Sequence, residues 1–247
     1  MADAKTLKSR LASGEFDARL KEVYLSDKAV EDQKKRDAVI IDEFVRLFGD
    51  NDSIELFSAP GRTEVGGNHT DHNHGKVLAA SVDLDTVAAA AKRDDGIIVE
   101  KSFKFDALEV DITDLEVHTE EFGKSSGLIR GMCAGFKERG YNIGGFNAAS
   151  MSRVLSGSGL SSSAAYEVLI GTILNHLYND GKVSPVEVAK IAQYAENKYF
   201  GKPCGLLDQT ASSVGSFITI DFKDPSRPII NKVDFDFASC GHALCII

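Results

Sequence analysis

Apolar residues recur at helical intervals over the first fifty positions and in short strand-like runs over much of the remainder. Residues 5–50 are charged and helix-prone, with apolar residues spaced for a helix up to Phe48 and a stop at Gly49. From Ile54 onward the apolar runs are short and bounded by glycine, aspartate or proline, which is typical of strands. The predicted strands occupy residues 54–59, 76–82, 86–91 and 96–103.

Helices and strands are both predicted in the second half. A glycine-punctuated helix over 126–139 precedes a strand over 146–155. One apolar stripe over 165–177 predicts a buried helix. The next helix opens with Ser184 as its cap, a proline at the first helical position and a glutamate three residues after the cap. Further strands are predicted at 216–222, 232–237 and 242–247.

Composition limits the classes of partner. The 247 residues, 43% hydrophobic, suffice for one large domain or two small ones. A formal net charge of −9 argues against nucleic acid as the main partner, since phosphate binding needs clustered cations. No stretch reaches the roughly 18 apolar residues of a membrane span, and the N-terminus lacks the apolar core of a secretory signal. The cysteines show no CxxC pairing, so we expect free thiols and a cytoplasmic protein.

The first stretch with candidate chemistry is rich in glycine and serine and lies between a predicted strand and a predicted helix. Glycines permit a tight turn and a close approach of ligand, and the free N–H groups of a helix start attract anions. The stretch is neither a Walker A loop nor a GxGxxG motif. A flexible turn with serine caps is the alternative, but we favour a phosphate site. Its residues are Gly157, Ser158, Gly159, Leu160, Ser161, Ser162 and Ser163.

The second stretch, residues 59–75, concentrates carboxylate, amide and imidazole groups between glycines. Such groups match the hydroxyls of a sugar, and Arg62 adds a permanent cation. A metal site is a second interpretation, and a solvated polar loop is a third. The HxHxDH pattern of metallo-hydrolases is not met, because Asp71 stands where its second histidine belongs. We favour the sugar loop. The metal-site candidates are His69, Asp71, His72 and His74.

Two acids follow in the third stretch. Glu196 lies at the edge of the apolar stripe of the helix that begins after Ser184, so it needs a cation or metal partner. Asp208 follows a turn that contains glycines and a proline, and a helix cap is its simplest interpretation. It becomes a functional candidate only if the fold places it beside Arg62.

Together these stretches resemble the galactokinases of the GHMP kinase superfamily. APGRTEVGGNHTDHNHG is similar to the galactokinase signature, GSGLSSSAA to the superfamily's phosphate loop, and ENKYFGKPCGLLDQTASSVG to the segment with the catalytic aspartate. They occur in the family's order and spacing, from about Ile54 to the last residue. The phosphate loop alone indicates the superfamily, whereas the first signature is far more specific.

The resemblance implies an α+β fold: a GHMP-kinase-type N-terminal domain with a mixed β-sheet backed by helices, plus the start of a second α+β domain. We expect a helical segment over 1–50, the domain with the sugar and phosphate loops over 51–215, and strands leading into a truncated C-terminal domain over 216–247. The final predicted strand has no polar tail, which favours a fragment. The family continues well past Ile247, so we expect little or no activity from these residues alone.

The resemblance also implies roles. Asp208 would be the general base at the anomeric hydroxyl of galactose, and Arg62 would keep Asp208 ionised and stabilise the moving phosphoryl group. The cofactors would be ATP and Mg²⁺, with Ser163 and Glu196 as metal ligands and the product galactose 1-phosphate. Nucleotide contacts would come from the stretch Gly157 to Ser163 and from Ser102. The sugar contacts would be Asn68, His69, Thr70, Asp71 and Gly205.

The phosphate loop usually begins with a proline where this chain has Leu155, a minor change to the stiffness of the turn. Two further departures bear on specificity: many galactokinases have glutamate where this chain has Asn68 and asparagine where it has Glu64. A related GHMP kinase for N-acetylgalactosamine or another hexose is therefore an alternative. A galactose sensor without catalysis is a further one, which we disfavour because the catalytic pair and both metal ligands are present.

Overall fold

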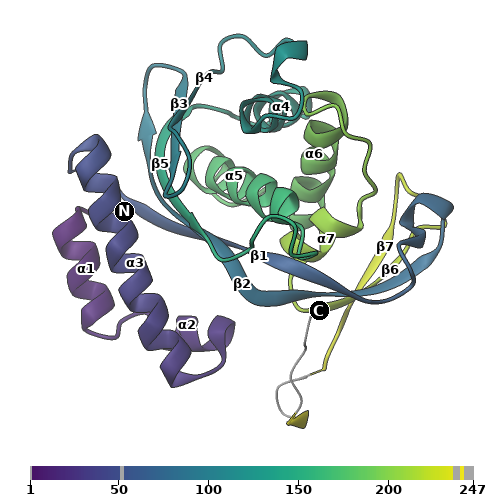
Figure 1. The fold of residues 1–247 in the computed structure, drawn as a ribbon, viewed down its shortest axis with the longest axis horizontal. Coiled ribbons are helices and arrows are strands. Elements are labelled where there is room, and N and C mark those ends of the chain that lie inside the picture. The colour runs from purple at the N-terminus through teal and green to yellow at the C-terminus, as the bar shows by residue number, and fades with distance from the viewer. Residues whose placement is uncertain (1, 51–52, 236–239, 242–247) are drawn as a thin grey trace.

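A mixed sheet lies between two layers of helices (Figure 1). The computed structural model describes residues 2–50, 53–235 and 240–241, and the sheet has seven strands within them. The predicted α+β class is confirmed, since β3 and β5 are parallel and the other pairs antiparallel. The helices are α1 (Ala4–Ala12), α2 (Asp17–Tyr24), α3 (Asp27–Phe48), α4 (Ser125–Glu138), α5 (Ser162–Asn179), α6 (Pro185–Lys198) and α7 (Leu207–Val214). The strands are β1 (Glu55–Gly66), β2 (Lys76–Arg93), β3 (Ile97–Ser102), β4 (Leu108–Asp111), β5 (Gly145–Ser152), β6 (Phe217–Asp221) and β7 (Ile229–Val233).

The long strand β2 organises the sheet. It pairs with β1 along one side, and β5 and β6 share the other. The sequence predicts two separate runs here, but the structure has one strand that continues through Asp83 and Asp85. Asp85 is tolerated inside it because Arg36, Tyr24 and Ser58 all donate hydrogen bonds to its carboxylate. The strand can therefore continue through Asp85 because groups outside β2 compensate the charge of this residue.

The alanine-rich half of β2 is buried on both faces. Val87, Ala89 and Ala91 pack with the N-terminal helices α1 and α3. Ala88 and Ala90 point the other way, into the core formed with α4, α5 and α6. Alternation along the strand explains the division, and the small side chains let both layers approach the sheet closely.

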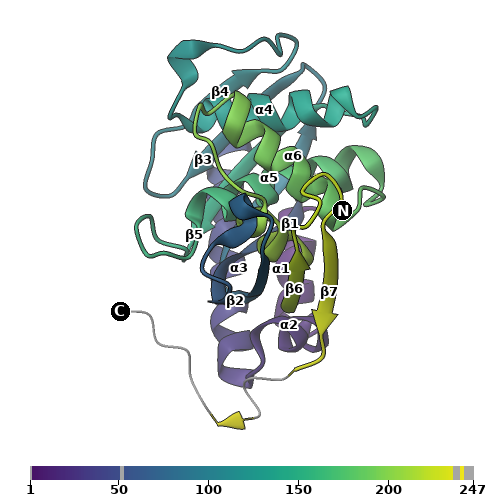
Figure 2. The same cartoon turned by 90° about the vertical axis from the view of Figure 1, so that its right-hand side faces the viewer.

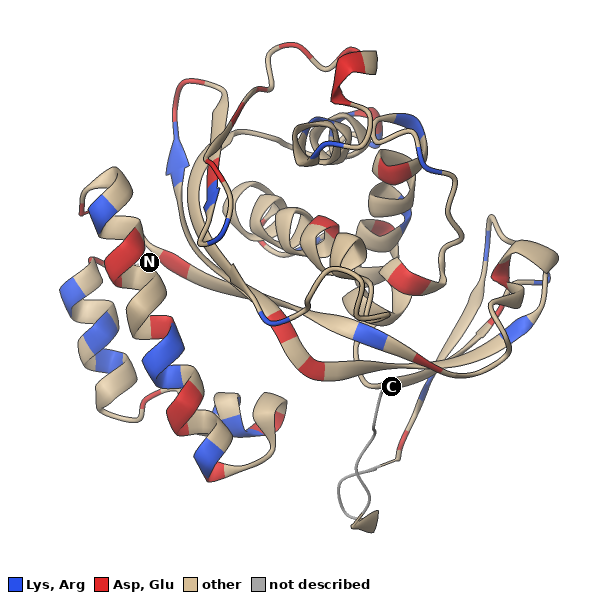
Figure 3. Cartoon of the chain, viewed as in Figure 1, with Lys and Arg blue, Asp and Glu red and all other residues tan. Residues whose placement is uncertain are grey.

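The N-terminal segment is helical as predicted, although it divides into α1, α2 and α3. Gly49 ends α3, as the sequence indicates. A buried ion pair joins α3 to the sheet: Arg36 bonds the carboxylate of Asp85 and also donates to the carbonyl oxygens of Asp85 (3.0 Å) and Met151 (2.8 Å). Charged residues gather on these helices, whereas α5 contains a single acidic residue and no Lys or Arg (Figure 3).

The C-terminal strands extend the same sheet. Figure 2 shows β6 and β7 side by side, and β6 also pairs with the first half of β2. The strand predicted at 232–237 begins earlier, at Ile229, and ends at Val233. The strand predicted at 242–247 lies outside the described residues. In the part of the chain that is described, no helix is both long and apolar enough to cross a bilayer.

Candidate active site

An arginine and an aspartate that are 146 positions apart in sequence form the centre of the site. Arg62 Nε donates to Asp208 Oδ1 at 2.6 Å, and Arg62 Nη2 donates to Oδ2 at 2.7 Å. This two-bond fork is the strongest geometry available to a guanidinium and a carboxylate. Arg62 lies on β1 rather than in a loop, and Asp208 lies in the first turn of α7. The fold thus meets the condition under which Asp208 becomes a functional candidate.

The environment keeps Asp208 ionised. Burial raises the pKa of its carboxyl group, but the hydrogen bonds and charge of Arg62 outweigh burial and leave the pKa below its ordinary value. Ser161 adds a hydrogen bond from its hydroxyl to Oδ2. The Asp208 side chain remains 30% exposed, against 9% for Arg62. The partly exposed carboxylate of Asp208 is therefore held by the mostly buried guanidinium of Arg62.

The glycine- and serine-rich stretch is a turn that leads from β5 to α5, as predicted. Gly157, Gly159 and Ser161 all have positive φ, at 78°, 76° and 57°. Arg62 anchors this turn as well, because its Nη1 donates to the Gly159 carbonyl at 2.6 Å and its backbone N–H donates to the Leu160 carbonyl at 3.0 Å. The hydroxyl of Ser161 bonds Asp208 instead of capping α5. The start of α5 thus offers N–H groups to an anion beside the carboxylate.

Side chains of this turn divide into two groups. Leu160 is 5% exposed and packs with Val154 and Ala165, so its side chain anchors the turn to the protein core. Ser158 donates its hydroxyl to the Leu155 carbonyl at 2.7 Å. Apart from the adjacent residues in sequence, no heavy atom of the described residues lies within 4 Å of a Cβ placed on Gly157 or Gly159, so the outer side of the turn is open to a ligand.

Buried carboxylates lie behind the start of α5. Ser163 Oγ donates to Glu196 Oε1 at 3.4 Å, and Glu196 is only 2% exposed. Glu167, one turn after Ser163, is fully buried, and burial together with the charge of Glu196 holds its pKa well above the ordinary value. Gln209 connects the two acids through its amide nitrogen, at 2.8 Å from Glu196 and 3.3 Å from Glu167. Lys202 completes the cluster, with Nζ 3.0 Å from Glu196 Oε1.

Ser163 and Glu196 fit a magnesium ion. Oxygens that neighbour each other in an octahedral shell at about 2 Å from Mg²⁺ lie about 3 Å apart. The 3.4 Å between Ser163 Oγ and Glu196 Oε1 is close to that spacing. A buried carboxylate that already holds a cation, the Lys202 ammonium, has the charge that such an ion requires.

The second stretch begins on β1 and continues as a loop. Asp71 is buried, and its Oδ2 accepts a hydrogen bond from the Leu207 backbone N–H at 3.3 Å, directly before Asp208. Its Oδ1 is buried with no hydrogen-bond partner among the residues that the structure describes, so a ligand hydroxyl could satisfy it. Gly205 packs so closely here that an added Cβ would lie 1.7 Å from Asp71 Oδ2.

The remaining residues of this loop are more open. Asn68 and His69 are exposed and have left-handed backbone conformations, with φ of 56° and 50°. The Glu64 carboxylate accepts a hydrogen bond from the His69 N–H at 2.8 Å. Thr70 is half-buried, and a Cβ on Gly75 would lie 2.2 Å from its hydroxyl. Close contacts thus fix the loop, while the side chains of Asn68 and His69 stay exposed.

Two predictions from the sequence remain outside this centre. Ser102 ends β3 opposite Ser150, on the strand that leads to the glycine-rich turn, and its role toward ATP stays a prediction. The metal-site interpretation of residues 69–74 finds no support in the geometry: the described residues contain no group of three or more His, Cys, Asp or Glu side chains suited to a metal.

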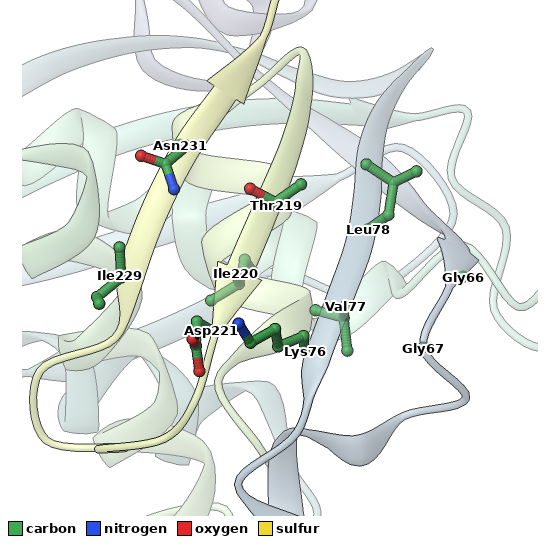
Figure 4. Close-up of a pocket in the computed structure, with 10 residues that line it drawn as sticks. All are labelled: Gly66, Gly67, Lys76, Val77, Leu78, Thr219, Ile220, Asp221, Ile229 and Asn231. Carbon is green, nitrogen blue, oxygen red and sulfur yellow. Dashed lines mark ion pairs between the residues drawn. The ribbon is translucent and has the colours of Figure 1, made fainter.

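An open pocket of about 410 Å³ lies elsewhere, where β2 and β7 begin and β6 ends, beside Gly66 and Gly67 (Figure 4). Lys76 and Asp221, which are partners on the adjacent strands β2 and β6, line it and form an ion pair at 3.1 Å. Neither Arg62 nor Asp208 lines this pocket. This pocket and the pair of Arg62 and Asp208 are therefore separate features of the molecule.

Several members of the site were not identified from the sequence. Glu196 is bonded by Gln209 and Lys202, and Gln209 also bonds Glu167. The local sequence around these three residues was not interpreted as part of a site. Glu167 had a usable signal, because it is the one acid in an apolar helix and lies four residues after Ser163 on the same face. Lys202 had none, since its place depends on the turn between α6 and α7.

Comparisons with known proteins agree with this geometry. Residues 42–92 match the family model of the galactokinase galactose-binding signature, and residues 127–216 match the GHMP kinases N-terminal domain. The galactokinase of Clostridium beijerinckii is 36% identical over 181 residues, which are 72% of this chain and 46% of the relative. That of Bacillus subtilis is 34% identical over 176 residues, 70% of this chain and 44% of the relative. The chain spans about half the length of these curated relatives.

Solved structures show the same fold. The crystal structure of Lactococcus lactis galactokinase complexed with galactose matches with a TM-score of 0.71 and 32% identity, over 80% of this chain and 52% of that one. Methanococcus jannaschii mevalonate kinase matches with a TM-score of 0.61 and 16% identity, over 76% and 58% of the two chains. The second likeness concerns the fold alone.

Proposed function

Because the chain belongs to the GHMP kinases and carries the galactokinase galactose-binding signature, we propose that it supplies the N-terminal half of a galactokinase. The reaction is transfer of the γ-phosphoryl group of ATP to the anomeric hydroxyl of galactose, which gives galactose 1-phosphate and ADP. The observation that carries the proposal is the two-bond pair of Arg62 and Asp208 beside the start of α5. In this proposal the pair supplies the carboxylate base and the fixed cation beside an anion site.

Asp208 receives the proton of the sugar hydroxyl as the sugar oxygen bonds to the γ-phosphorus and the bond from phosphorus to the leaving oxygen of ADP breaks. A carboxylate with a lowered pKa is a weak base, which suits a loose transition state in which the proton leaves late. Arg62 stabilises the negative charge on the oxygens of the moving group, and positioning with charge neutralisation supplies most of the rate.

The nucleotide phosphates bind at the turn from Gly157 to Ser163, where backbone N–H groups at the start of α5 face outward. Ser163 and Glu196 hold Mg²⁺, which when bound neutralises charge on the phosphates. Ser102 completes the nucleotide contacts from the end of the neighbouring strand. Because Arg62 Nη1 donates to the Gly159 carbonyl of this turn, phosphate groups bound at the turn would lie beside Arg62.

The sugar is held by polar groups of residues 68–71. Asp71 offers a buried carboxylate oxygen, and Gly205 leaves room for it. Asn68, His69 and Thr70 bond the other hydroxyls. The Lactococcus lactis relative was crystallised with galactose. Asn68 stands where many galactokinases have glutamate, which favours N-acetylgalactosamine or another hexose as the second candidate substrate.

We also propose the division expected from the sequence: a helical segment over 1–50, the kinase domain over 51–215, and strands of 216–247 that lead into a second domain. Since the chain covers about half of its relatives, these residues alone should show little or no turnover. The cytoplasm is the proposed compartment, in keeping with free thiols at Cys133 and Cys204.

The test uses the full-length protein with ATP, Mg²⁺ and a mixture of hexoses, with mass spectrometry of the products. We expect galactose 1-phosphate as the main product and its loss in Asp208→Ala with the fold retained. Preference for N-acetylgalactosamine would select the second substrate, and sugar binding without ADP release would select a sensor. Robust turnover by Asp208→Ala would refute the assigned base.

A further inference from the structure

The turn between α6 and α7 brings a lysine to the candidate metal carboxylate. Lys202 Nζ lies 3.0 Å from Glu196 Oε1, the same oxygen that lies 3.4 Å from Ser163 Oγ. The two partners differ in exposure: the Glu196 side chain is 3% exposed, and that of Lys202 is 61% exposed. The ammonium group therefore reaches a buried carboxylate from the solvent side.

The turn fixes the backbone of this lysine and leaves its side chain free to move. The Lys202 backbone N–H donates to the Glu196 carbonyl at 3.1 Å, so the residue cannot drift away from α6. Gly201, with φ of 76°, makes the reversal possible just before it. A long exposed side chain on a fixed backbone can exchange one partner for another at little cost.

Glu196 needs a cation whether or not a metal is bound. Glu167 is fully buried beside it, and in the described part of the chain its Oε1 has no hydrogen-bond partner. The single amide group of Gln209 donates to both acids but carries no charge. A carboxylate held away from water beside a second acid is costly unless a positive charge compensates it. Lys202 supplies that charge.

We propose that Lys202 is a resident counter-cation of Glu196 that competes with the divalent metal for carboxylate oxygen Oε1. The inference rests on the proposed function for its metal. Lys202 must release Glu196 before a metal ion can take that oxygen, so it lowers the affinity of the site for metal while it stabilises the metal-free protein. Both effects follow from one ammonium group at one oxygen.

A Mn²⁺ titration of the full-length protein tests the competition directly, with the concentration of free Mn²⁺ measured by electron paramagnetic resonance. Mn²⁺ shares the oxygen ligands and octahedral preference of magnesium. Lys202→Met should tighten Mn²⁺ binding by about fivefold, the equivalent of one half-exposed ion pair. Lys202→Arg should bind Mn²⁺ like the wild type, because it keeps the charge. Glu196→Gln should weaken binding.

Lys198→Met is the matched control, because Lys198 is 50% exposed at the end of α6, the helix that carries Glu196, but contacts Tyr194 and Glu138 instead. It should leave the Mn²⁺ affinity unchanged. Equal or weaker binding in Lys202→Met would overturn the proposal. So would a wild-type affinity that Glu196→Gln does not change, or no Mn²⁺ binding in either the wild type or Lys202→Met.

Thermal unfolding gives a second measurement. The metal-free Lys202→Met protein should melt below the wild type, and saturating Mn²⁺ should raise its melting temperature by more than it raises that of the wild type. Equal increments in the two proteins would contradict the competition. Product analysis of the wild type is independent: absence of sugar phosphate would reject the kinase, whereas the Mn²⁺ titration decides on Lys202.

Discussion

Arg62 and Asp208 should be strongly coupled in stability, so that losing both costs little more than losing either. Breaking a fully buried ion pair from one side costs about 3–5 kcal/mol. Asp208 keeps 30% of its side-chain exposure and the hydroxyl of Ser161, so we expect Arg62→Met to cost about 2 kcal/mol. Asp208→Asn should cost about the same, because it leaves the guanidinium 9% exposed without its charge partner.

The double variant leaves no unpaired charge. Additive costs would sum to about 4 kcal/mol, whereas we expect about 2 kcal/mol, a coupling of about 2 kcal/mol. Urea unfolding of the four full-length proteins at pH 7, followed by circular dichroism, measures the cycle. Arg46→Met is the surface control: Arg46 pairs with Glu43 but is 63% exposed, so its loss should cost under about 1 kcal/mol.

Additive costs, within about 0.5 kcal/mol, would refute the pairing on which the site depends. The same variants test the chemistry. Loss of a charge-stabilising donor lowers turnover by about a hundred- to a thousandfold, so Arg62→Met should lower kcat/KM by that factor even where the protein stays folded. An active Arg62→Met enzyme would show that the guanidinium is a structural group alone.

Three further predictions concern pH and packing. Arg62 keeps the pKa of Asp208 low, so wild-type kcat/KM should not depend on this group above about pH 4, whereas in Arg62→Met burial dominates and the acid limb of a pH–rate profile should move toward neutrality. Gly205→Ala should raise KM for the sugar by at least about tenfold with a smaller change in KM for ATP, because the new Cβ would displace Asp71 Oδ2; equal changes in steady-state kinetics would contradict this. Burial raises the pKa of Asp37 to about 7, so the folded protein retains a proton that the unfolded chain loses near pH 4. The free energy of unfolding should therefore decrease as the pH rises from about 4 to about 7. Asp37→Asn should match the wild type near pH 4 and exceed it at pH 8 by up to about 4 kcal/mol in urea unfolding; equal stability at pH 8 would contradict the burial of a proton there.

Local signals were sufficient for the elements that carry them. Ser184 caps α6: its hydroxyl oxygen accepts a hydrogen bond from the Glu187 N–H at 3.2 Å, as the capping pattern predicts. The apolar stripe of α5 and the burial of Glu196 were likewise readable from spacing. The continuity of β2 was not, because the ion pair that makes Asp85 acceptable comes from Arg36, 49 positions away.

The site divides in the same way. Motif resemblance identified Arg62, Asp208, Ser163 and Glu196, and the fold places each pair in contact. The cluster around Glu196 required a tertiary structure, because a turn between helices places Lys202 at its carboxylate. Long-range polar contacts have no periodicity to detect, so a single sequence contains no pattern that announces them.

Successive alanines of β2 can serve as independent reporters. Ala88 belongs to the core around α5 and Ala89 to the layer formed by the N-terminal helices, although one peptide bond joins them. An isotopic label or one extra methyl group at either position would sense a different half of the molecule. Loosening of the N-terminal layer and of the core around α5 could thus be followed separately from adjacent sites on one strand.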